Sequence, residues 1–376
     1  MVLHRLLARR ASSMGVVVLA AATVLSTAGV AGAVSDDPAG QRATRSVVTA
    51  SDETTSSLAR PSAARGGAGA RGTSEIDSAR ESRAVLDYWT PRRMRNAVPV
   101  EAPGAAGAGT ARSVAAAPAL EPSSRVSRPV GPPGAQDRTR AARAAFTGTA
   151  GKVFFTQNGT NYVCSGSAVN SSSKRLVATA AHCVHGGRGG TWHTNWMFEA
   201  GYQSGPVADQ RGRFTAYRFR VFNEWIRYGR DDGRGFNSDV GFVTTNKNVT
   251  SRRRVVDAVG GMGLKTGGPY ELGITLIGYP INRARGEEQK SCKGKTGKRK
   301  LGASSRYRFV SISGCRFGNG ASGGPWLTAY NNRTGVGTLR TVSSFGPTDS
   351  NSYIAGPYFR SGVFDLFRAA NRDFKG

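Results

Sequence analysis

The sequence predicts an all-β domain over residues 145–376, a sandwich or barrel that ends in a single helix. Short runs rich in β-branched and aromatic residues recur at regular intervals, and Gly- and Asn-rich turns separate them. The final run changes its period, because Val363, Phe364, Phe367 and Ala370 recur at helical spacing. A length of about 230 residues suits one large β domain or two small barrels that share a core.

Each expected strand is a short apolar run that ends at a turn signal. In chain order, the expected strands are Val153–Thr156, Tyr162–Val169, Arg175–Ala180, Thr191–Glu199, Phe214–Phe222, Val240–Thr245, Ile274–Gly278, Tyr307–Ile312, Gly324–Thr328 and Thr338–Ser343. The amphipathic run that follows predicts a terminal helix packed on the body of the domain.

Residues 34–144 are predicted to form a low-complexity, largely disordered pro-region or linker. Ala, Ser, Arg, Gly and Pro dominate it without apolar periodicity, so it buries too little surface to offset its ordering entropy. One island, Ala84–Val100, gathers Leu86, Trp89 and Met94. We interpret this island as the docking element of a propeptide; the alternative is a chance aromatic cluster in a linker.

Residues 1–33 read as a secretory signal peptide. Three arginines precede an apolar stretch over residues 14–30, and Ala31-Gly32-Ala33 supplies a small-residue cleavage pattern. The alternative is an uncleaved membrane anchor, which the short run with its Ser and Thr residues disfavours. We therefore expect a secreted protein that has no contact with the membrane once the signal is removed.

Four cysteines, Cys164, Cys183, Cys292 and Cys315, agree with export to an oxidising compartment. An even number allows three disulfide connectivities, and the sequence alone does not select one. We favour the sequential pairing, Cys164 with Cys183 and Cys292 with Cys315. A zinc site is the competing interpretation, but neither a CxxC nor an HxxxH spacing occurs.

The net charge is +28, and it is concentrated in the C-terminal part of the chain. Residues 141–376 hold 34 of the 52 basic side chains but only 13 of the 24 acidic ones. Two clusters stand out, Lys293–Lys300 and Arg252–Arg254. They either bind a polyanion or form solvated basic loops, and we favour the second interpretation. Because no nucleic-acid motif accompanies them, we expect no specific nucleic-acid partner.

Three short segments carry residues suited to nucleophilic catalysis: Ala178–Cys183 (ATAAHC), Asn237–Gly241 (NSDVG) and Gly318–Pro325 (GNGASGGP). A serine hydroxyl becomes a good nucleophile only when a neighbouring base takes its proton. The glycines around Ser322 permit a tight turn that presents the hydroxyl and leaves backbone N–H groups free for a developing oxyanion. Ser322 is therefore the candidate nucleophile.

The order of the candidate residues along the chain distinguishes between the known classes of serine hydrolase. No histidine follows Ser322, as an α/β-hydrolase would require, and no suitable Asp precedes His182, as a subtilisin would require. The order available is His182, then Asp239, then Ser322. Asp231 and Asp232 are rival carboxylates, but their surroundings read as a solvated turn. We expect the two nearby histidines, His185 and His193, to be structural or surface residues.

The pentapeptide TAAHC, combined with NGASGGP in the right order, resembles the trypsin/chymotrypsin-like serine endopeptidases, in particular secreted actinobacterial members. The resemblance covers about residues 146–370. It implies a fold of two six-stranded antiparallel β-barrels with the active site between them. It also implies that Ser322 is the nucleophile, that His182 is the general base and acid, and that Asp239 orients the imidazole.

The resemblance implies further roles at the site. The backbone N–H groups of Gly320 and Ser322 would form the oxyanion hole. The segment with Ser344, Phe345 and Gly346 would pair with an extended substrate, and Ser344 would bond the triad Asp. Gly356 would lie on the strand that closes the specificity pocket. The pair Cys164 and Cys183 matches the family disulfide beside the catalytic His.

Two positions depart from the family pattern. Ala321 replaces the Asp that, in the trypsin subgroup, pairs with the new N-terminus after activation, so we expect activation by removal of a propeptide instead. Arg316 stands six residues before Ser322, where the family often places the base of the specificity pocket. An arginine there would favour substrates with an acidic side chain by charge pairing.

We therefore expect a signal peptide (1–33), a pro-region (34–144) and a serine protease domain (145–376). The expected substrate is a protein or peptide, the chain's own propeptide is a candidate inhibitor, and no metal or organic cofactor is needed. We expect the enzyme to be a monomer. The alternatives are a catalytically silent homologue that binds a surface or polymer, and a serine esterase on the same fold.

Overall fold

We analysed a computed structural model of the chain, which describes residues 75–100, 121–134, 147–203, 212–230, 233–301, 307–347 and 350–374. All of them belong to one compact unit, Thr49–Gly376. The expected signal peptide, most of the expected pro-region, and the rival carboxylates Asp231 and Asp232 lie outside the described residues. Within the described ranges, none of the helices combines the length and the hydropathy needed to cross a bilayer.

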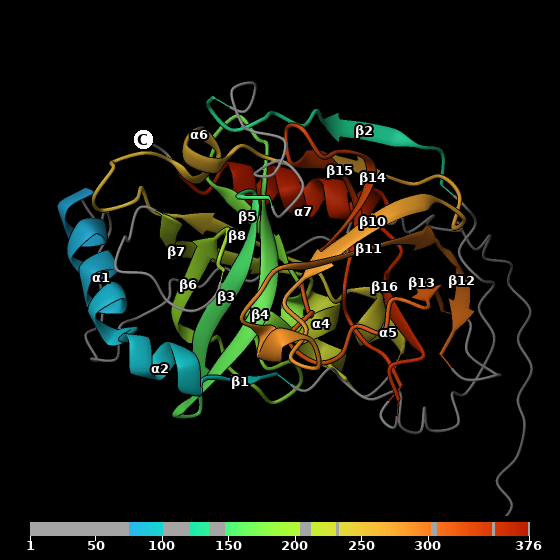
Figure 1. The fold of residues 1–376 in the computed structure, drawn as a ribbon, viewed down its shortest axis with the longest axis horizontal. Coiled ribbons are helices and arrows are strands. Elements are labelled where there is room, and N and C mark those ends of the chain that lie inside the picture. The colour runs from blue at the N-terminus through green and yellow to red at the C-terminus, as the bar shows by residue number, and fades with distance from the viewer. Residues whose placement is uncertain are drawn as a thin grey trace, which may run out of the picture. The chain divides into compact units, whose positions relative to one another are not determined.

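The first half of the domain is a closed, six-stranded antiparallel barrel (Figure 1). Its strands run in the order β4, β3, β6, β7, β8, β5, and β5 returns to pair with β4. Their bounds are β3 (Ala150–Gln157), β4 (Thr160–Val169), β5 (Leu176–Thr179), β6 (Thr194–Ala200), β7 (Arg213–Val221) and β8 (Gly241–Thr245). Each one overlaps a strand expected from the sequence, and closure removes the free edges that an open sheet would expose.

The second half of the domain is built from two sheets around one small core rather than from one continuous closed ladder. The larger sheet has the order β11, β10, β14, β15, β9, β2, and the smaller has the order β12, β13, β16. The bounds are β2 (Ser124–Ser127), β9 (Gly263–Thr266), β10 (Gly273–Gly278), β11 (Lys290–Lys295), β12 (Gly297–Lys300), β13 (Arg308–Ser313), β14 (Pro325–Asn331), β15 (Val336–Val342) and β16 (Tyr353–Pro357). The sheets meet where the Thr341 hydroxyl donates to the Pro357 carbonyl, at 2.6 Å.

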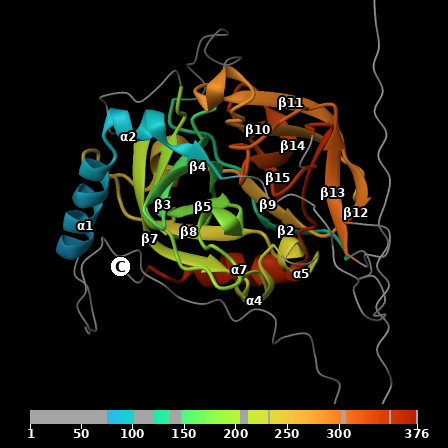
Figure 2. The ribbon, with the colours of Figure 1, turned by 90° about the horizontal axis from the view of Figure 1, so that it is seen from below.

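The N-terminal region contributes elements that its composition did not predict. Helices α1 (Glu75–Tyr88) and α2 (Pro91–Asn96) lie against the first barrel, and the short strand β1 (Val98–Pro99) pairs with β4 (Figure 2). The apolar island at 84–100 thus docks on the barrel, as its aromatic content suggested. Strand β2 was missed because its Ser- and Arg-rich sequence has no apolar period and its order comes from pairing with β9.

Two short helices lie between β7 and β8 of the first barrel, a third lies between β8 and β9, and a longer helix ends the domain. These are α4 (Asn223–Tyr228), α5 (Gly233–Asn237), α6 (Val255–Val259) and α7 (Ser361–Asn371). The terminal helix α7 buries Val363, Leu366, Phe367 and Ala370, which is the face that its periodicity predicted. Phe367 packs edge-on against Phe242 of β8, at 5.7 Å between ring centroids, and the helix lies against β7 and β8 of the first barrel.

The basic run at residues 293–300 forms strands rather than the solvated loop that we expected. Lys293 and Lys295 are exposed on β11, with the less exposed Gly294 between them, and Lys298 and Lys300 are exposed on β12, with the less exposed Arg299 between them. A strand with a charged outer face is a common way to prevent an edge from pairing with another molecule. The high charge of the run led to the prediction of a loop, although the alternation of long and short side chains at period two in its first half is typical of a strand.

Two histidines expected to be structural or on the surface are buried in the first barrel. His193 stacks on Phe155 with ring centroids 4.4 Å apart, and it lies within hydrogen-bond distance of the His182 carbonyl. Burial lowers the pKa of His193 to about 3 and that of His185 to about 4. Both rings are therefore neutral in the folded protein at pH 5, although they would be protonated in the unfolded chain.

Replacing His193 with Gln should weaken the acid dependence of stability. Between pH 6.5 and 5, unfolding binds a proton at His193, so stability falls as the pH falls, by about 1.4 kcal/mol per pH unit near pH 5. Burial raises the pKa of Glu199 to about 7, so protonation of Glu199 stabilises the folded protein as the pH falls and offsets part of the effect of His193. The prediction therefore concerns the difference in slope between wild type and variant. Urea unfolding at several pH values measures it, and equal slopes for the two proteins would contradict the prediction.

Candidate active site

The pairing of β5 with β8 brings His182 and Asp239 together. These strands run antiparallel, with Thr179 opposite Gly241, so the residues after β5 meet the residues before β8. His182 lies in a 3₁₀ turn (Ala181–Cys183) directly after β5, and Asp239 lies two residues before β8. The local topology thus converts a separation of 57 residues into a hydrogen bond.

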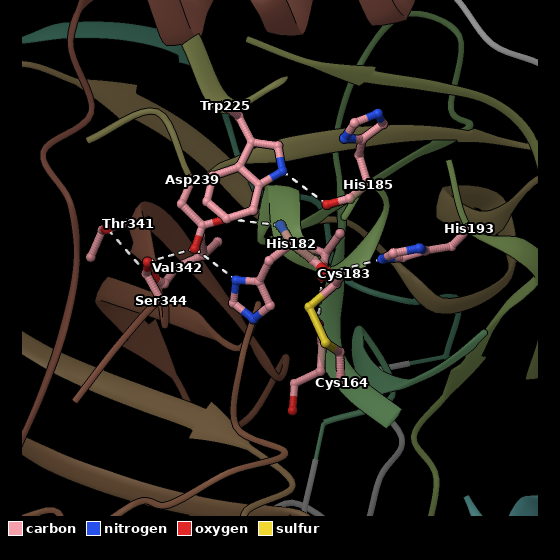
Figure 3. Close-up of polar contacts among 12 residues, drawn as sticks. Cys164, His182, Cys183, His185, His193, Trp225, Asp239, Thr341, Val342 and Ser344 are labelled. Atoms are coloured by element: carbon pink, nitrogen blue, oxygen red, sulfur yellow. Dashed lines mark hydrogen bonds and ion pairs between the residues drawn. A yellow bond between two sulfur atoms is a disulfide. The ribbon is translucent and has the colours of Figure 1, made fainter. Parts of the chain in front are cut away.

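Asp239 is a fully buried carboxylate that accepts three hydrogen bonds (Figure 3). Its Oδ2 lies 2.7 Å from Nδ1 of His182 and 2.6 Å from the Ser344 hydroxyl, and its Oδ1 accepts the His182 backbone N–H at 2.9 Å. A carboxylate so placed favours the imidazole tautomer with a proton on Nδ1. The remaining nitrogen, Nε2, is buried and has no hydrogen-bond partner among the described residues.

Trp225 of α4 packs beside this pair, with its ring centroid 6.1 Å from that of His182 (Figure 3). Its indole N–H donates to the His185 carbonyl at 2.9 Å, which fixes the ring as a buried wall. Trp225 was not among the predicted site residues, because no motif distinguishes a tryptophan beside the site from one in the ordinary core.

The four cysteines form two disulfides, Cys164–Cys183 and Cys292–Cys315, which is the sequential pairing favoured above. The first joins β4 to the turn that carries His182. His182 and these two cysteines place possible ligand atoms within 4.8 Å of one another, but both sulfur atoms are already bonded in the disulfide. The thiolates that a zinc site of this kind would need are therefore absent.

Ser322 is presented by a tight turn at the matching end of the second half of the domain. Pro325 of β14 pairs with Val342 of β15, so the residues before β14 lie beside the residues after β15. Gly323 N–H donates to the Ser343 carbonyl, at 2.8 Å, just before the segment that bonds Asp239. Gly323 has φ +79°, and a Cβ there would lie 2.1 Å from Thr179 Oγ1, so only glycine fits.

The carbonyl groups of this turn are engaged, whereas two of its N–H groups are not. The carbonyls of Asn319, Gly320 and Ser322 accept hydrogen bonds from Ile281 N–H, the Ser165 hydroxyl and Ser165 N–H. The N–H groups of Gly320 and Ser322 are in buried residues and donate to no acceptor among the described residues. Unpaired buried N–H groups are rare in proteins, and here they can bind an anionic oxygen.

Ser165 connects the turn that holds Ser322 to the rest of the molecule, and it was not among the predicted site residues. Its hydroxyl accepts the Tyr279 N–H at 3.0 Å and donates to the Gly320 carbonyl at 2.8 Å, while its N–H bonds Ser322 at 2.7 Å. Ala321 is fully buried among apolar side chains, so neutral hydrogen bonds rather than an ion pair hold this turn. A serine in the middle of a strand gives no sequence signal for this role.

The expected substrate-binding residues fall on adjoining segments. Ser344 and Phe345 both donate their N–H groups to the Ala355 carbonyl of β16, at 2.9 and 3.1 Å. Gly346 follows them with Tyr353 as a close neighbour, and Gly356 lies one residue beyond Ala355 on β16.

The rings of Phe236 and Phe309 contact Phe345, both at 4.9 Å between centroids. These residues therefore form one wall beside Ser344.

Arg316 lies on the adjoining loop, but its side chain is exposed. Its backbone has φ 52°, and its carbonyl accepts a hydrogen bond from the Asn282 amide. The neighbouring buried side chain is Phe317, with 3 % of its surface exposed. The charge of Arg316 is therefore at the surface of the loop, and the preference for acidic substrates stays a prediction.

Comparisons with known proteins agree with this architecture. The family model described as Trypsin matches residues 140–360. Two solved structures, each 28 % identical with a TM-score of 0.53, are a thermostable serine protease AL20 from an extremophilic microorganism and the protease Anisep from Arthrobacter nicotinovorans. The aligned regions cover 61 % and 60 % of this chain and 99 % and 97 % of those chains.

A search of curated protein sequences found no match. The family model nevertheless spans more than half of the chain, and the two solved relatives align over almost their whole length. The chain therefore belongs to the trypsin family and is a chymotrypsin-like serine protease.

Proposed function

We propose that the protein is a secreted endopeptidase that cleaves peptide bonds through an acyl-enzyme on Ser322, with His182 and Asp239 completing the triad. One observation carries the proposal: Asp239 holds Nδ1 of His182, and Nε2 is left buried and unpartnered among the described residues. A histidine in this state can accept a proton from a hydroxyl that approaches Nε2.

The chemistry follows from these positions. Ser322 Oγ attacks the substrate carbonyl carbon, and its proton moves to His182 Nε2. The carbonyl oxygen becomes negative and accepts hydrogen bonds from the N–H groups of Gly320 and Ser322. His182 then gives the proton to the leaving nitrogen as the carbon–nitrogen bond breaks. Water repeats the same steps on the acyl-enzyme and regenerates Ser322.

The turn around Ser322 needs no salt bridge in this proposal, because Ser165 and Tyr279 supply the hydrogen bonds that orient it. This arrangement explains why an uncharged residue, Ala321, can stand before Ser322: the turn is held by neutral groups that are already buried in the folded chain. Removal of the N-terminal segment would then act on access to the site rather than on the formation of the oxyanion hole.

Secretion is part of the proposal. Two disulfides support an oxidising compartment, because such bonds persist outside the cytosol. The signal peptide, the zymogen form, the monomeric state and a protein substrate are proposed from the sequence. The two other candidate functions, an esterase and a silent binding homologue, differ from the proposal in measurable activity.

Labelling with a fluorophosphonate probe should distinguish these functions. The native protein should be labelled, Ser322→Ala should not be, and Asp239→Asn should be labelled far more slowly, with kcat lower by about 10⁴-fold. Matched amide and ester substrates, blocked at both ends, test endopeptidase against esterase activity. Absence of labelling in a protein whose melting temperature shows that it is folded would favour the silent homologue.

Replacing Ser165 with Ala should lower kcat and leave KM nearly unchanged. The change leaves the buried Gly320 carbonyl without its donor and loosens the oxyanion N–H groups, and each 1.4 kcal/mol lost in the transition state is tenfold in rate. We expect a decrease of about 10- to 100-fold.

Ser167→Ala is the matched control, because Ser167 is buried on the same strand and its hydroxyl has no partner among the described residues. Its kcat should stay within about twofold of wild type. Equal losses in the two variants, or a loss expressed in KM alone, would show that Ser165 does not position the oxyanion groups.

A further inference from the structure

The edge of β4 that faces away from β3 bonds three partners one after another. Backbone groups alternate in direction along a strand, so Val163, Ser165 and Ser167 turn away from β3 and toward the other edge. Along that edge, Ser167–Val169 pairs with β5, Ser165 N–H bonds the Ser322 carbonyl, and Tyr162–Val163 pairs with β1. β1 therefore lies on the same edge as the nucleophile, about 7 Å along the strand from it.

The contact of β1 with β4 is small. The strands run parallel with Val98 opposite Tyr162 and Pro99 opposite Val163, and Val100 N–H donates to the Val163 carbonyl at 3.2 Å. Pro99 has no N–H to donate, and 45 % of Val98 is exposed. So few hydrogen bonds would not hold a strand in place without further contacts.

The preceding helices supply those contacts. Trp89 is 1 % exposed, packs on Phe154 with ring centroids 5.4 Å apart, and donates its indole N–H to the Asn195 carbonyl at 2.5 Å. Met94 is buried in the same cluster, which also includes Met197 on the outer face of the barrel. The segment is thus anchored through its helices and through Val100, which follows β1 and is 3 % exposed in the main core cluster, whereas β1 itself adds few hydrogen bonds.

The position of β1 bears on substrate binding at the nucleophile. The turn that holds Ser322 is bonded on both sides: Gly323 N–H donates to the carbonyl of Ser343, which precedes Ser344, and the Ser322 carbonyl accepts the N–H of Ser165 on β4. If the acyl side of a substrate follows Ser344 and Phe345, the leaving side extends toward the edge of β4. An extended chain there would add to this edge as a strand, using the backbone groups of Val163. Val100 already occupies one of those groups.

We infer that β1 is an occluding strand, which blocks the leaving side of the cleft to extended polypeptides and leaves it open to substrates with short leaving groups. The inference rests on the proposed endopeptidase function. In this inference the N-terminal segment blocks the binding of substrate residues that follow the scissile bond. It does not cover the triad or the oxyanion hole.

The test compares two substrates that share one acyl side. The first ends in an aminocoumarin leaving group, and the second continues for four residues beyond the scissile bond. In the full chain, with residues 75–100 verified by intact mass, kcat/KM should be low for the extended substrate only. Val100→Pro, which removes the N–H donor, should raise that value at least tenfold and leave the coumarin substrate unchanged.

Val98→Thr is the matched control, because it alters an exposed side chain of the same strand and keeps the backbone donor at Val100. It should behave as wild type toward both substrates. An equal effect of Val100→Pro on the two substrates, or no effect on either, would overturn the inference. Failure to cleave either substrate, together with failure to label Ser322, would instead overturn the proposed function on which it rests.

A measurement on the wild-type chain covers the case in which Val100→Pro does not fold. A peptide with a reduced, uncleavable central bond and four residues on each side is added, and amide hydrogen exchange is followed at Val100. Faster exchange in the complex is expected, because the peptide must displace β1. Unchanged exchange with the peptide bound would show that the two occupy different surfaces.

Discussion

The buried carboxylate of Asp239 is the constraint on which the site depends. It receives the His182 ring and backbone from the first barrel and the Ser344 hydroxyl from the second half of the domain. A buried carboxylate is costly unless its oxygens are satisfied, so these donors must be held in place when the two halves pack. The orientation of the His182 ring and the joining of the two halves are therefore consequences of one set of hydrogen bonds.

The turn that holds Ser322 obeys a second constraint, which is that its carbonyl groups must accept hydrogen bonds. Once Ser165, Ile281 and the turn itself engage those oxygens, the N–H groups of Gly320 and Ser322 are left toward the site. Tyr279 connects this arrangement to the start of the domain, because its hydroxyl contacts Gln289, which also holds Thr147. The turn with Gly320 and Ser322 is thereby tied to the contact between the two halves by neutral hydrogen bonds, and no charged side chain stands at Ala321.

The first barrel is apolar on part of its outer face as well as inside, and this explains its N-terminal cover. Val153 and Phe155 point into the core, while Phe154 between them lies with Met197 on the outside. Consecutive apolar residues in an antiparallel strand require two buried faces. Trp89 and its neighbours bury the second face and, in doing so, bring β1 to the edge of β4 beside Ser322.

Local signals along the chain were enough to predict the six strands of the first barrel, four strands of the second half, the terminal helix and the candidate triad of His182, Asp239 and Ser322. They also suggested that the island with Trp89 docks. They did not predict β1, β2, β9, β11 or β12. Contacts between distant segments set the surroundings of Ser165 and Trp225, the strands in the lysine-rich run, the exposed position of Arg316, and the pairing of β1 with β4. Each of these depends on which distant group lies opposite a backbone atom or side chain, and spacing along the chain carries no such information.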